Sequence, residues 1–428
     1  MLIFIPFLNE CGSSGKNGVS SVMLCCFEPV KIYLTKIQER MMRKLMTALI
    51  IMAIIFAGCS KKVENFKTEE QNGIKIYSNT ETPNDPTAKL ELKKLFTISS
   101  EAQTDTSAYL KRPITITADN NDNIYILDLM SMSAKKFDSS GNFVKSIGRM
   151  GQGPGELFYP SIMFIDKDTL NIMSAASRKL SKYDLDGNFY YEKMLTDQSQ
   201  IQNSKISRDG QKMAAFVVKQ IPKEGQQPDI DFALSIIEMS TLSQKSSLSS
   251  KILSIQDLMS GKIDFNDLVI PFIPGNEYVY VSENSDNQYR IFGYDYEGKK
   301  KAEIRKDYKM IRYENKEKEE YIASMKKMMQ GGQQQEVKVG NFKKAIVTMH
   351  TDKYGRLLVY PNVDRNLDKE GVYLDIFKDG MFLNRVPYSI QEKGNTGLVG
   401  MFKAQEFFIG NRLYVLNGEE LTLDVYDY

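Results

Sequence analysis

Residues 113–160 read PITITADNNDNIYILDLMSMSAKKFDSSGNFVKSIGRMGQGPGELFYP. Four short runs in this stretch alternate apolar and polar side chains, at residues 114–118, 123–127, 134–137 and 143–147. Asp, Asn, Ser and Gly separate the runs, and these residues favour turns. The stretch therefore predicts four consecutive antiparallel strands that form one small sheet.

The same pattern returns about every fifty residues along the chain. Further sets of strands are predicted at residues 161–194, 201–239, 277–305, 345–387 and 404–428. Small sheets repeated at this period indicate a β-propeller, in which the sheets form blades around an axis. A chain of 428 residues could hold two or three ordinary domains, but a propeller of this size is a single all-β domain.

The first blade also carries a recognisable motif. Its residues are Pro113, Asp119, Asn123-Ile124-Tyr125-Ile126, Asp128, Lys136-Phe137-Asp138, Gly141, and the run from Ile147-Gly148 to Glu156-Leu157. This blade resembles an NHL repeat, and the whole chain resembles the six-bladed propeller lipoproteins of Bacteroides-type bacteria. The resemblance is specific over this blade, looser over the other repeats and absent from residues 1–40. It implies a fold and a compartment, and it names no ligand.

The last blade lacks one strand at the carboxyl end of the chain. Residues 90–98, LELKKLFTI, alternate as a strand and have no blade of their own. An open ring would leave two unpaired sheet edges. We therefore predict that residues 90–98 complete the last blade, which gives six four-stranded antiparallel blades within residues 90–428.

Two segments interrupt the repeat. Residues 252–274, after a serine-rich stretch at 240–250, are expected to form an irregular surface loop. A helix is predicted in an insertion at about 313–332, with Asn315 as its N-cap and Gly331-Gly332 as its end. Its apolar face consists of Tyr321, Ile322, Met325, Met328 and Met329. This face packs on the propeller rim or forms a lid over the central channel.

The N-terminal region carries an export signal. Residues 41–58 contain Met41-Met42-Arg43-Lys44, an apolar run too short to span a bilayer, and Ala57-Gly58 before Cys59. This order resembles a bacterial lipoprotein signal peptide and implies lipidation of Cys59, although Phe56 stands where that family usually has Leu. Cys59 is also the sole cysteine after residue 58, so the exported chain has no disulfide framework.

The segments on either side of the signal have different interpretations. Residues 1–40 precede the basic start of the signal, and we interpret them as an upstream extension of the gene model. Residues 59–89 are polar and contain Pro83 and Pro86, so a flexible tether is expected there.

The charge of the chain argues against nucleic-acid binding. The formal net charge is +2, and residues 59–428 hold 50 basic and 51 acidic side chains. A nearly neutral exported chain lacks the basic surface that binds phosphate backbones. The predicted partners are instead a membrane, through the lipid, and a protein or a glycan.

Few residues in the sequence are suited to catalysis. His350 is the only histidine, which removes most His-based zinc sites and Ser-His or Cys-His catalysis. Propeller hydrolases and lactonases often hold calcium in the channel, so carboxylates could serve as ligands. The candidates are Asp119, Asp128, Asp166, Asp209, Glu283, Asp352 and Asp364. Asp119, Asp209 and Asp352 follow inner strands, where Asp more often bonds to its own backbone.

The sequence analysis leads to one main hypothesis and one alternative. The main hypothesis is a lipid-anchored binding module of the cell envelope, most consistent with the outer membrane, without cofactor, metal or catalytic residues. Its ligand would meet channel-facing side chains, for which Arg149, Arg178, Tyr289 and Arg290 are the candidates. The alternative is a calcium-dependent propeller hydrolase or lactonase with a site in the channel.

Overall fold

The computed structural model describes residues 40–42, 44–46, 64–195, 200–259, 263–328, 337–364, 372–388, 390 and 404–428. The chain divides into two compact units, residues 1–64 and residues 65–428. In the first unit residues 40–42 and 44–46 are helical, whereas Cys59 and the rest of the predicted signal lie outside the described residues. Among the described helices none is long and apolar enough to cross a membrane.

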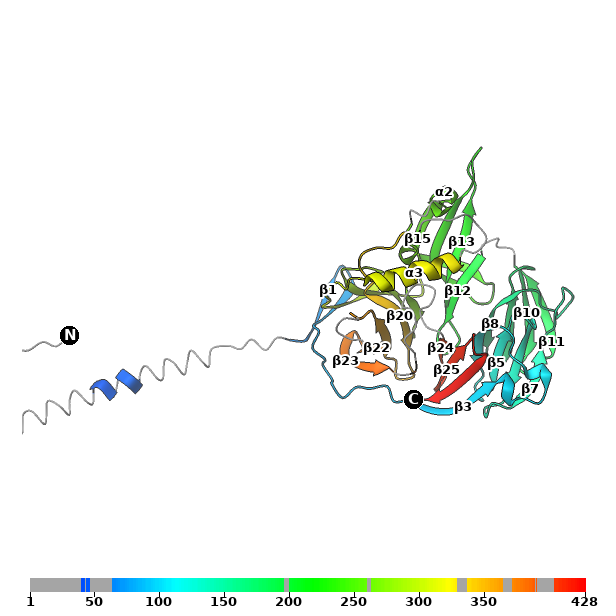
Figure 1. The fold of residues 1–428 in the computed structure, drawn as a ribbon, viewed down its shortest axis with the longest axis horizontal. Coiled ribbons are helices and arrows are strands. Elements are labelled where there is room, and N and C mark those ends of the chain that lie inside the picture. The colour runs from blue at the N-terminus through cyan, green and yellow to red at the C-terminus, as the bar shows by residue number, and fades with distance from the viewer. Residues whose placement is uncertain are drawn as a thin grey trace, which may run out of the picture. The chain divides into compact units, whose positions relative to one another are not determined.

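The second unit is a six-bladed β-propeller (Figure 1). Blade one contains β4 (Pro113–Ala118), β5 (Ile124–Asp128), β6 (Ser133–Phe137) and β7 (Phe143–Ile147). Blade two contains β8 (Pro160–Asp166), β9 (Thr169–Ser174), β10 (Lys179–Asp184) and β11 (Phe189–Met194). Blade three contains β12 (Gln200–Ile206), β13 (Met213–Ile221), β14 (Asp229–Glu238) and β15 (Ser243–Ser254).

The other three blades follow in chain order. Blade four contains β16 (Phe272–Pro274), β17 (Val279–Ser282), β18 (Tyr289–Tyr294) and β19 (Lys300–Lys306). Blade five contains β20 (Ile346–Thr351), β21 (Leu357–Pro361), β22 (Val372–Lys378) and β23 (Met381–Tyr388). Blade six contains β24 (Ala404–Ile409), β25 (Arg412–Asn417), β26 (Thr422–Asp427) and β3 (Lys93–Ser99). The predicted all-β, six-bladed fold of four-stranded antiparallel sheets is confirmed.

The hydrophobic core lies between the blades rather than in one central mass. Each neighbouring pair of blades shares one cluster of buried side chains: Tyr125 of blade one, for example, belongs to the same cluster as Ile172 of blade two. Five further clusters join blades two to three, three to four, four to five, five to six, and six to one. The central strands β5 and β6 are buried along their whole length. The sheet of blade one is therefore packed against a neighbouring blade on each face.

The predicted closure of the ring is confirmed. β3 pairs antiparallel with β26, with Ser99 opposite Thr422 and Phe96 opposite Val425. Ile98 is 1% exposed and lies in the cluster shared by blades six and one. The segment near the N-terminus thus supplies the outer strand of the last blade, as an unpaired edge requires.

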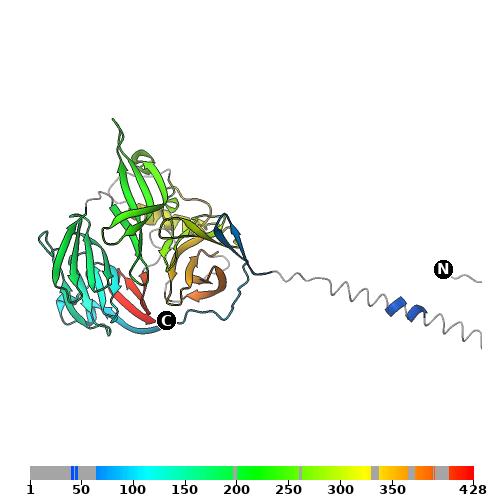
Figure 2. The same cartoon turned by 180° about the vertical axis from the view of Figure 1, so that it is seen from behind.

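The expectation of a flexible tether over residues 59–89 is wrong for residues 66–79. β1 (Phe66–Gln71) and β2 (Ile74–Asn79) form a hairpin, and β2 pairs parallel with β19, so the sheet of blade four has six strands. Asn72 and Gly73 have φ of 52° and 74°, as a two-residue hairpin turn requires. Figure 2 shows the hairpin beside blade four from the other side. Pairing with a strand more than two hundred residues away stabilises a segment whose composition is polar.

The hairpin is fastened to blade five as well. The side-chain amide of Asn79 donates to the carbonyl oxygens of Arg305 and Gly380, both at 3.0 Å, and its oxygen accepts from the Phe382 amide at 2.7 Å. Further along, the Asn384 side chain donates to the carbonyl oxygens of residues 86 and 88, each at 3.0 Å. Residues 65–99 therefore run along the outer strands of blades four, five and six.

Blades three and four differ from the predicted strands in two places. Residues 243–250 of the serine-rich stretch belong to strand β15, which pairs with β14 and has no buried residue. Residues 252–274, expected to form a loop, contain the end of β15, the short helix α2 (Ile255–Met259) and the buried strand β16. The serine-rich composition of β15 and the short length of β16 hide these strands in the sequence, and pairing with an existing sheet edge decides their conformation.

The inserted helix is present as predicted. α3 (Asn315–Met328) lies between blades four and five, and Tyr321 is buried beside Val337. The Lys343 ammonium lies 2.6 Å from the Glu317 carboxylate and ties the helix to the segment that enters blade five. These contacts match the predicted packing on the rim. The side chains at 325 and 328, and residue 329, lie outside the described part.

Candidate functional site in the central channel

The first strand of each blade faces the propeller axis. These strands, β4, β8, β12, β16, β20 and β24, surround a cavity of about 1450 Å³. The turns that follow β4, β8, β12 and β24 also line it, so the cavity extends to the end of the channel where the inner strands finish, here called the turn mouth. No residue of α3 is among the described residues that line the cavity, and the side chains at 324, 325, 327 and 328 lie outside the described part.

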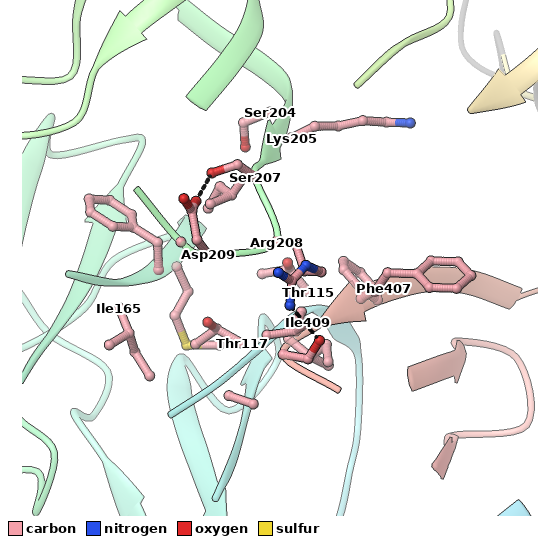
Figure 3. A pocket seen from close by; sticks show the side chains of 18 of the residues that line it. Thr115, Thr117, Ile165, Ser204, Lys205, Ser207, Arg208, Asp209, Phe407 and Ile409 are labelled. Atoms are coloured by element: carbon pink, nitrogen blue, oxygen red, sulfur yellow. Dashed lines mark hydrogen bonds between the residues drawn. The ribbon is translucent and has the colours of Figure 1, made fainter. Parts of the chain in front are cut away.

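The walls of the cavity are apolar with scattered hydroxyl groups, and the turn mouth is polar. The apolar wall includes Ile116, Ile162, Phe164, Ile165, Ile206, Phe407 and Ile409. The hydroxyl groups come from Thr115, Thr117, Ser161, Ser204, Thr348 and Thr351. At the mouth lie Asp119, Asn120, Asp122, Asp166, Asp168, Asp209, Gln211 and Asn411. Figure 3 shows part of this surface.

Several mouth carboxylates hold their own turns. Asp119 Oδ1 accepts hydrogen bonds from the backbone amides of Asn121 and Asn123, both at 2.9 Å. Asp209 accepts from the Gln211 amide and the Ser207 hydroxyl. Asp352, in the corresponding turn of blade five, accepts from two amides at 3.0 and 2.9 Å. The predicted backbone role of these three residues is confirmed.

Two cations of blade three extend across the channel. The guanidinium of Arg208 donates to the Gly410 carbonyl oxygen of blade six at 2.9 Å, and therefore spans the turn mouth. Deeper in, the Lys205 ammonium donates to Thr348 Oγ1 of blade five at 3.3 Å and lies 5.7 Å from the centre of the Phe272 ring. Burial lowers the pKa of Lys205 to about 8, and the charge of Glu406 offsets this effect only in part.

A buried polar group lies behind Lys205. Glu406 accepts a hydrogen bond from the Tyr360 hydroxyl, and one of its carboxylate oxygens lies 3.6 Å from His350 Nε2. Burial raises the pKa of Tyr360 well above its usual range, so the phenol stays protonated and donates. Burial and the charge of Lys205 lower the pKa of His350 well below its usual range, so the imidazole stays neutral. Lys205 and Glu406 are therefore the two charged residues of this cluster, whereas Tyr360 and His350 are neutral.

The four residues predicted to face the channel do not line the cavity, and the structure does not bring them together. Arg149 lies in the link between blades one and two, where its guanidinium binds Glu156 at 3.0 Å. Arg178 lies in the turn between β9 and β10 with a φ of 49°. Tyr289 and Arg290 lie on β18, the third strand from the axis; Tyr289 is buried and Arg290 binds Glu283 at 3.1 Å. The expectation that they face the channel is therefore wrong.

The predicted calcium ligands do not share one site: Asp119, Asp166 and Asp209 lie at the turn mouth, whereas Asp128 and Glu283 lie elsewhere. Asp128 binds backbone amides at residues 111 and 112, at 2.6 and 2.8 Å, and Glu283 binds Arg290. Asp166 is exposed at the turn mouth. Across the described residues, no three His, Cys, Asp or Glu side chains gather in a way that could hold a metal ion.

Sequence reasoning missed Lys205, Arg208 and Glu406. A signal for Lys205 is present in the sequence, because residues 201–207 are predicted to form the first strand of a blade. The first strand lines the axis of a propeller, so a lysine within it is a channel residue. The approach of Glu406 to His350 could not be foreseen, because it depends on which side chains of blades five and six share an interface.

Comparison with known proteins agrees with this fold. The model of a family described as DUF5128, 6-bladed beta-propeller, matches residues 80–349. The chain belongs to this six-bladed propeller family. The match begins after the β1–β2 hairpin. No curated protein matches the chain.

Solved structures with a similar fold come from several organisms. A putative exported protein of Bacteroides fragilis aligns with a TM-score of 0.43 and 15% identity, covering 82% of this chain and 98% of that one. Virginiamycin B lyase of Staphylococcus aureus aligns with a TM-score of 0.40 and 11% identity, covering 79% and 100%. A gluconolactonase of Xanthomonas campestris aligns with a TM-score of 0.39 and 11% identity, covering 78% and 89%.

Proposed function

We propose that this protein is a lipid-anchored binding protein of the cell envelope that receives part of a glycan in the channel of its propeller, without covalent chemistry. The observation that carries the proposal is the cavity of about 1450 Å³ bounded by the inner strands of all six blades. Concave sites with apolar walls and a few polar groups are the usual form of ligand sites. Carboxylate, amide and hydroxyl groups at the turn mouth suit the hydroxyl groups of sugars.

The anchor is part of the same proposal. Residues 41–58 and Cys59 have the order of a lipoprotein signal, and the propeller unit begins at residue 65. Five residues, 60–64, separate Cys59 from the propeller unit, and the six steps from residue 59 to residue 65 span at most about 20 Å, since each step adds about 3.4 Å. The lipid would tether the propeller to a membrane, and the cavity would be its ligand site.

Two experiments test the two parts. Mass spectrometry of the native N-terminal peptide should show a diacylglyceryl group on Cys59, and Cys59→Ser should move the protein from the membrane fraction to the soluble envelope fraction. An unmodified Cys59 in membrane-bound protein would overturn the anchor.

Binding is tested with a glycan panel and two tryptophan variants. Thr117→Trp fills the cavity from β4, whereas Thr68→Trp places the same side chain on the exposed outer strand β1. We expect Thr68→Trp to bind like the wild type and Thr117→Trp to lose binding at least tenfold. Binding that Thr117→Trp leaves unchanged would contradict a channel site, and binding of peptides alone would assign the channel to a protein partner.

A further inference from the structure

Lys205 and Arg208 are two cations of the channel that form no ion pair with a carboxylate of the described residues. Lys205 bonds only to the Thr348 hydroxyl, and Arg208 bonds to the Gly410 carbonyl oxygen. Figure 3 shows Lys205 extended from β12, away from Ser207 and Asp209. Both side chains come from one strand and its turn, so blade three places positive charge along the channel from the mouth inward.

Two arginines at the inner ends of other blades are paired with carboxylates. Arg412 Nη2 lies 3.4 Å from Asp122 at the same mouth, and Arg356 Nε lies 2.6 Å from Asp352 in blade five. Burial of an ammonium is costly, because it removes water that the protein replaces only in part. Among the described residues the Lys205 ammonium has one hydrogen-bond acceptor, Thr348 Oγ1, which leaves two of its three N–H donors for an anion.

The surroundings of Lys205 define what kind of anion fits. Thr348 and His350 of β20, Phe272 of β16 and Glu406 of β24 are the groups that face it. His350 is neutral and Glu406 already accepts from Tyr360, so the net charge of this group is close to zero when Lys205 is protonated. A single carboxylate would bind the Lys205 ammonium against the repulsion of Glu406, and each further negative charge on the ligand would add to that repulsion.

The residues at the turn mouth also limit the negative charge that the ligand can carry. Asp166 and Asp168 are exposed beside the entrance, and like charges repel a polyanion that approaches them. Arg208 and Lys167 are cations that a single carboxylate would meet at the entrance before it reaches Lys205. The site thus favours a ligand with one carboxylate at its leading end and a neutral, hydroxyl-rich remainder.

We propose that Lys205 binds the carboxylate of the ligand, so that the channel selects an acidic sugar, a uronate, at the end of the glycan. This inference rests on the proposed function, because it names the ligand class of the same cavity. The recognition is a charge-assisted hydrogen bond and involves no bond making or breaking within the ligand.

The proposal predicts a link between binding and protonation. Since burial lowers the pKa of free Lys205 to about 8, the amine is largely protonated at pH 7 and largely neutral at pH 9. A bound carboxylate favours the protonated form, so the complex takes up a proton as it forms. The affinity should therefore fall about tenfold between pH 7 and pH 9, which follows from the protonated fraction at each pH.

Isothermal titration calorimetry of the purified protein tests this inference. The probe is galacturonate, its matched control is the galacturonate methyl ester, and N-acetylglycine with its amide tests a carboxylate from a peptide end. We expect galacturonate to bind at pH 7 at least tenfold more tightly than the ester. Preference for N-acetylglycine would keep the carboxylate site and overturn the sugar. Equal binding of acid and ester would overturn the inference.

Two variants distinguish the effect of Lys205 on binding from the effect of other positive charge at the turn mouth. Lys205→Met keeps the length of the side chain and should lose the preference for the acid over the ester, together with the pH dependence. Lys167→Gln removes an exposed cation of the same mouth and should leave both unchanged. If Lys205→Met does not fold, the pH profile and proton uptake of the wild type decide by themselves.

The outcomes also distinguish this inference from the proposed function. Neutral glycans that bind, are blocked by Thr117→Trp and ignore Lys205→Met would leave the channel function intact and overturn the carboxylate site. Failure of every glycan and both carboxylate probes would overturn both.

Discussion

Ring closure makes a quantitative prediction at Ile98. This side chain is 1% exposed and lies in the cluster that joins blade six to blade one. Ile98→Ala removes three carbon atoms from a packed interface, and such substitutions cost about 2–5 kcal/mol of unfolding free energy. Because the interface joins the first and last blades, we expect a loss of about 3 kcal/mol with an unchanged denaturant slope.

Leu95 provides the matched control on the same strand. Its side chain is 40% exposed, so Leu95→Ala should change the unfolding free energy by less than about 0.5 kcal/mol. Urea unfolding followed by far-ultraviolet circular dichroism measures both variants. If Ile98→Ala costs no more than Leu95→Ala, β3 is not packed into blade six in solution and the reasoning about closure fails.

Three further predictions concern the hairpin, the inner turns and the buried histidine. Gly380 has a φ of 80°, and a Cβ there would lie 2.3 Å from the ring of Tyr77 on β2. Gly380→Ala should therefore lower the unfolding free energy in urea by about 1–3 kcal/mol more than Gly410→Ala, where φ is 56° and the space is open. Equal losses would contradict docking of the hairpin. Asp352→Ala breaks a buried ion pair with Arg356 and should lower the unfolding free energy by about 3–5 kcal/mol. The exposed Asp209→Ala should lower it by about 1 kcal/mol, and similar losses for the two variants would reject a structural role specific to blade five. His350 has a lowered pKa, so the unfolded chain binds a proton below about pH 6.5 that the folded protein does not, and stability should fall as the pH drops. His350→Gln should remove up to about 1.4 kcal/mol per pH unit of that slope, measured by urea unfolding between pH 7 and pH 5.5; an unchanged slope would show that His350 is protonated in the folded protein.

The amino-acid sequence determined those features that depend on neighbours along the chain. The alternating runs of blade one, the aspartates that hold the inner turns and the helix at Asn315–Met328 are local patterns, and each was predicted. The six-bladed ring was also predicted from the sequence. The strand at residues 90–98 has no blade of its own and the last blade lacks one strand, so pairing the two leaves no unpaired sheet edge.

The tertiary structure alone decided those features that depend on partners distant in the chain. β1 and β2 are polar, and they are strands because the edge of β19 is available to them. The three residues of β16 are too few to show any periodicity. Lys205 became a candidate ligand site only when blades three, five and six placed it beside Thr348 and Glu406. The physical reason is common to all three: alternation fixes which face of a strand is apolar, whereas the partner of that face, and the charge or space left beside it, is fixed by how the blades pack.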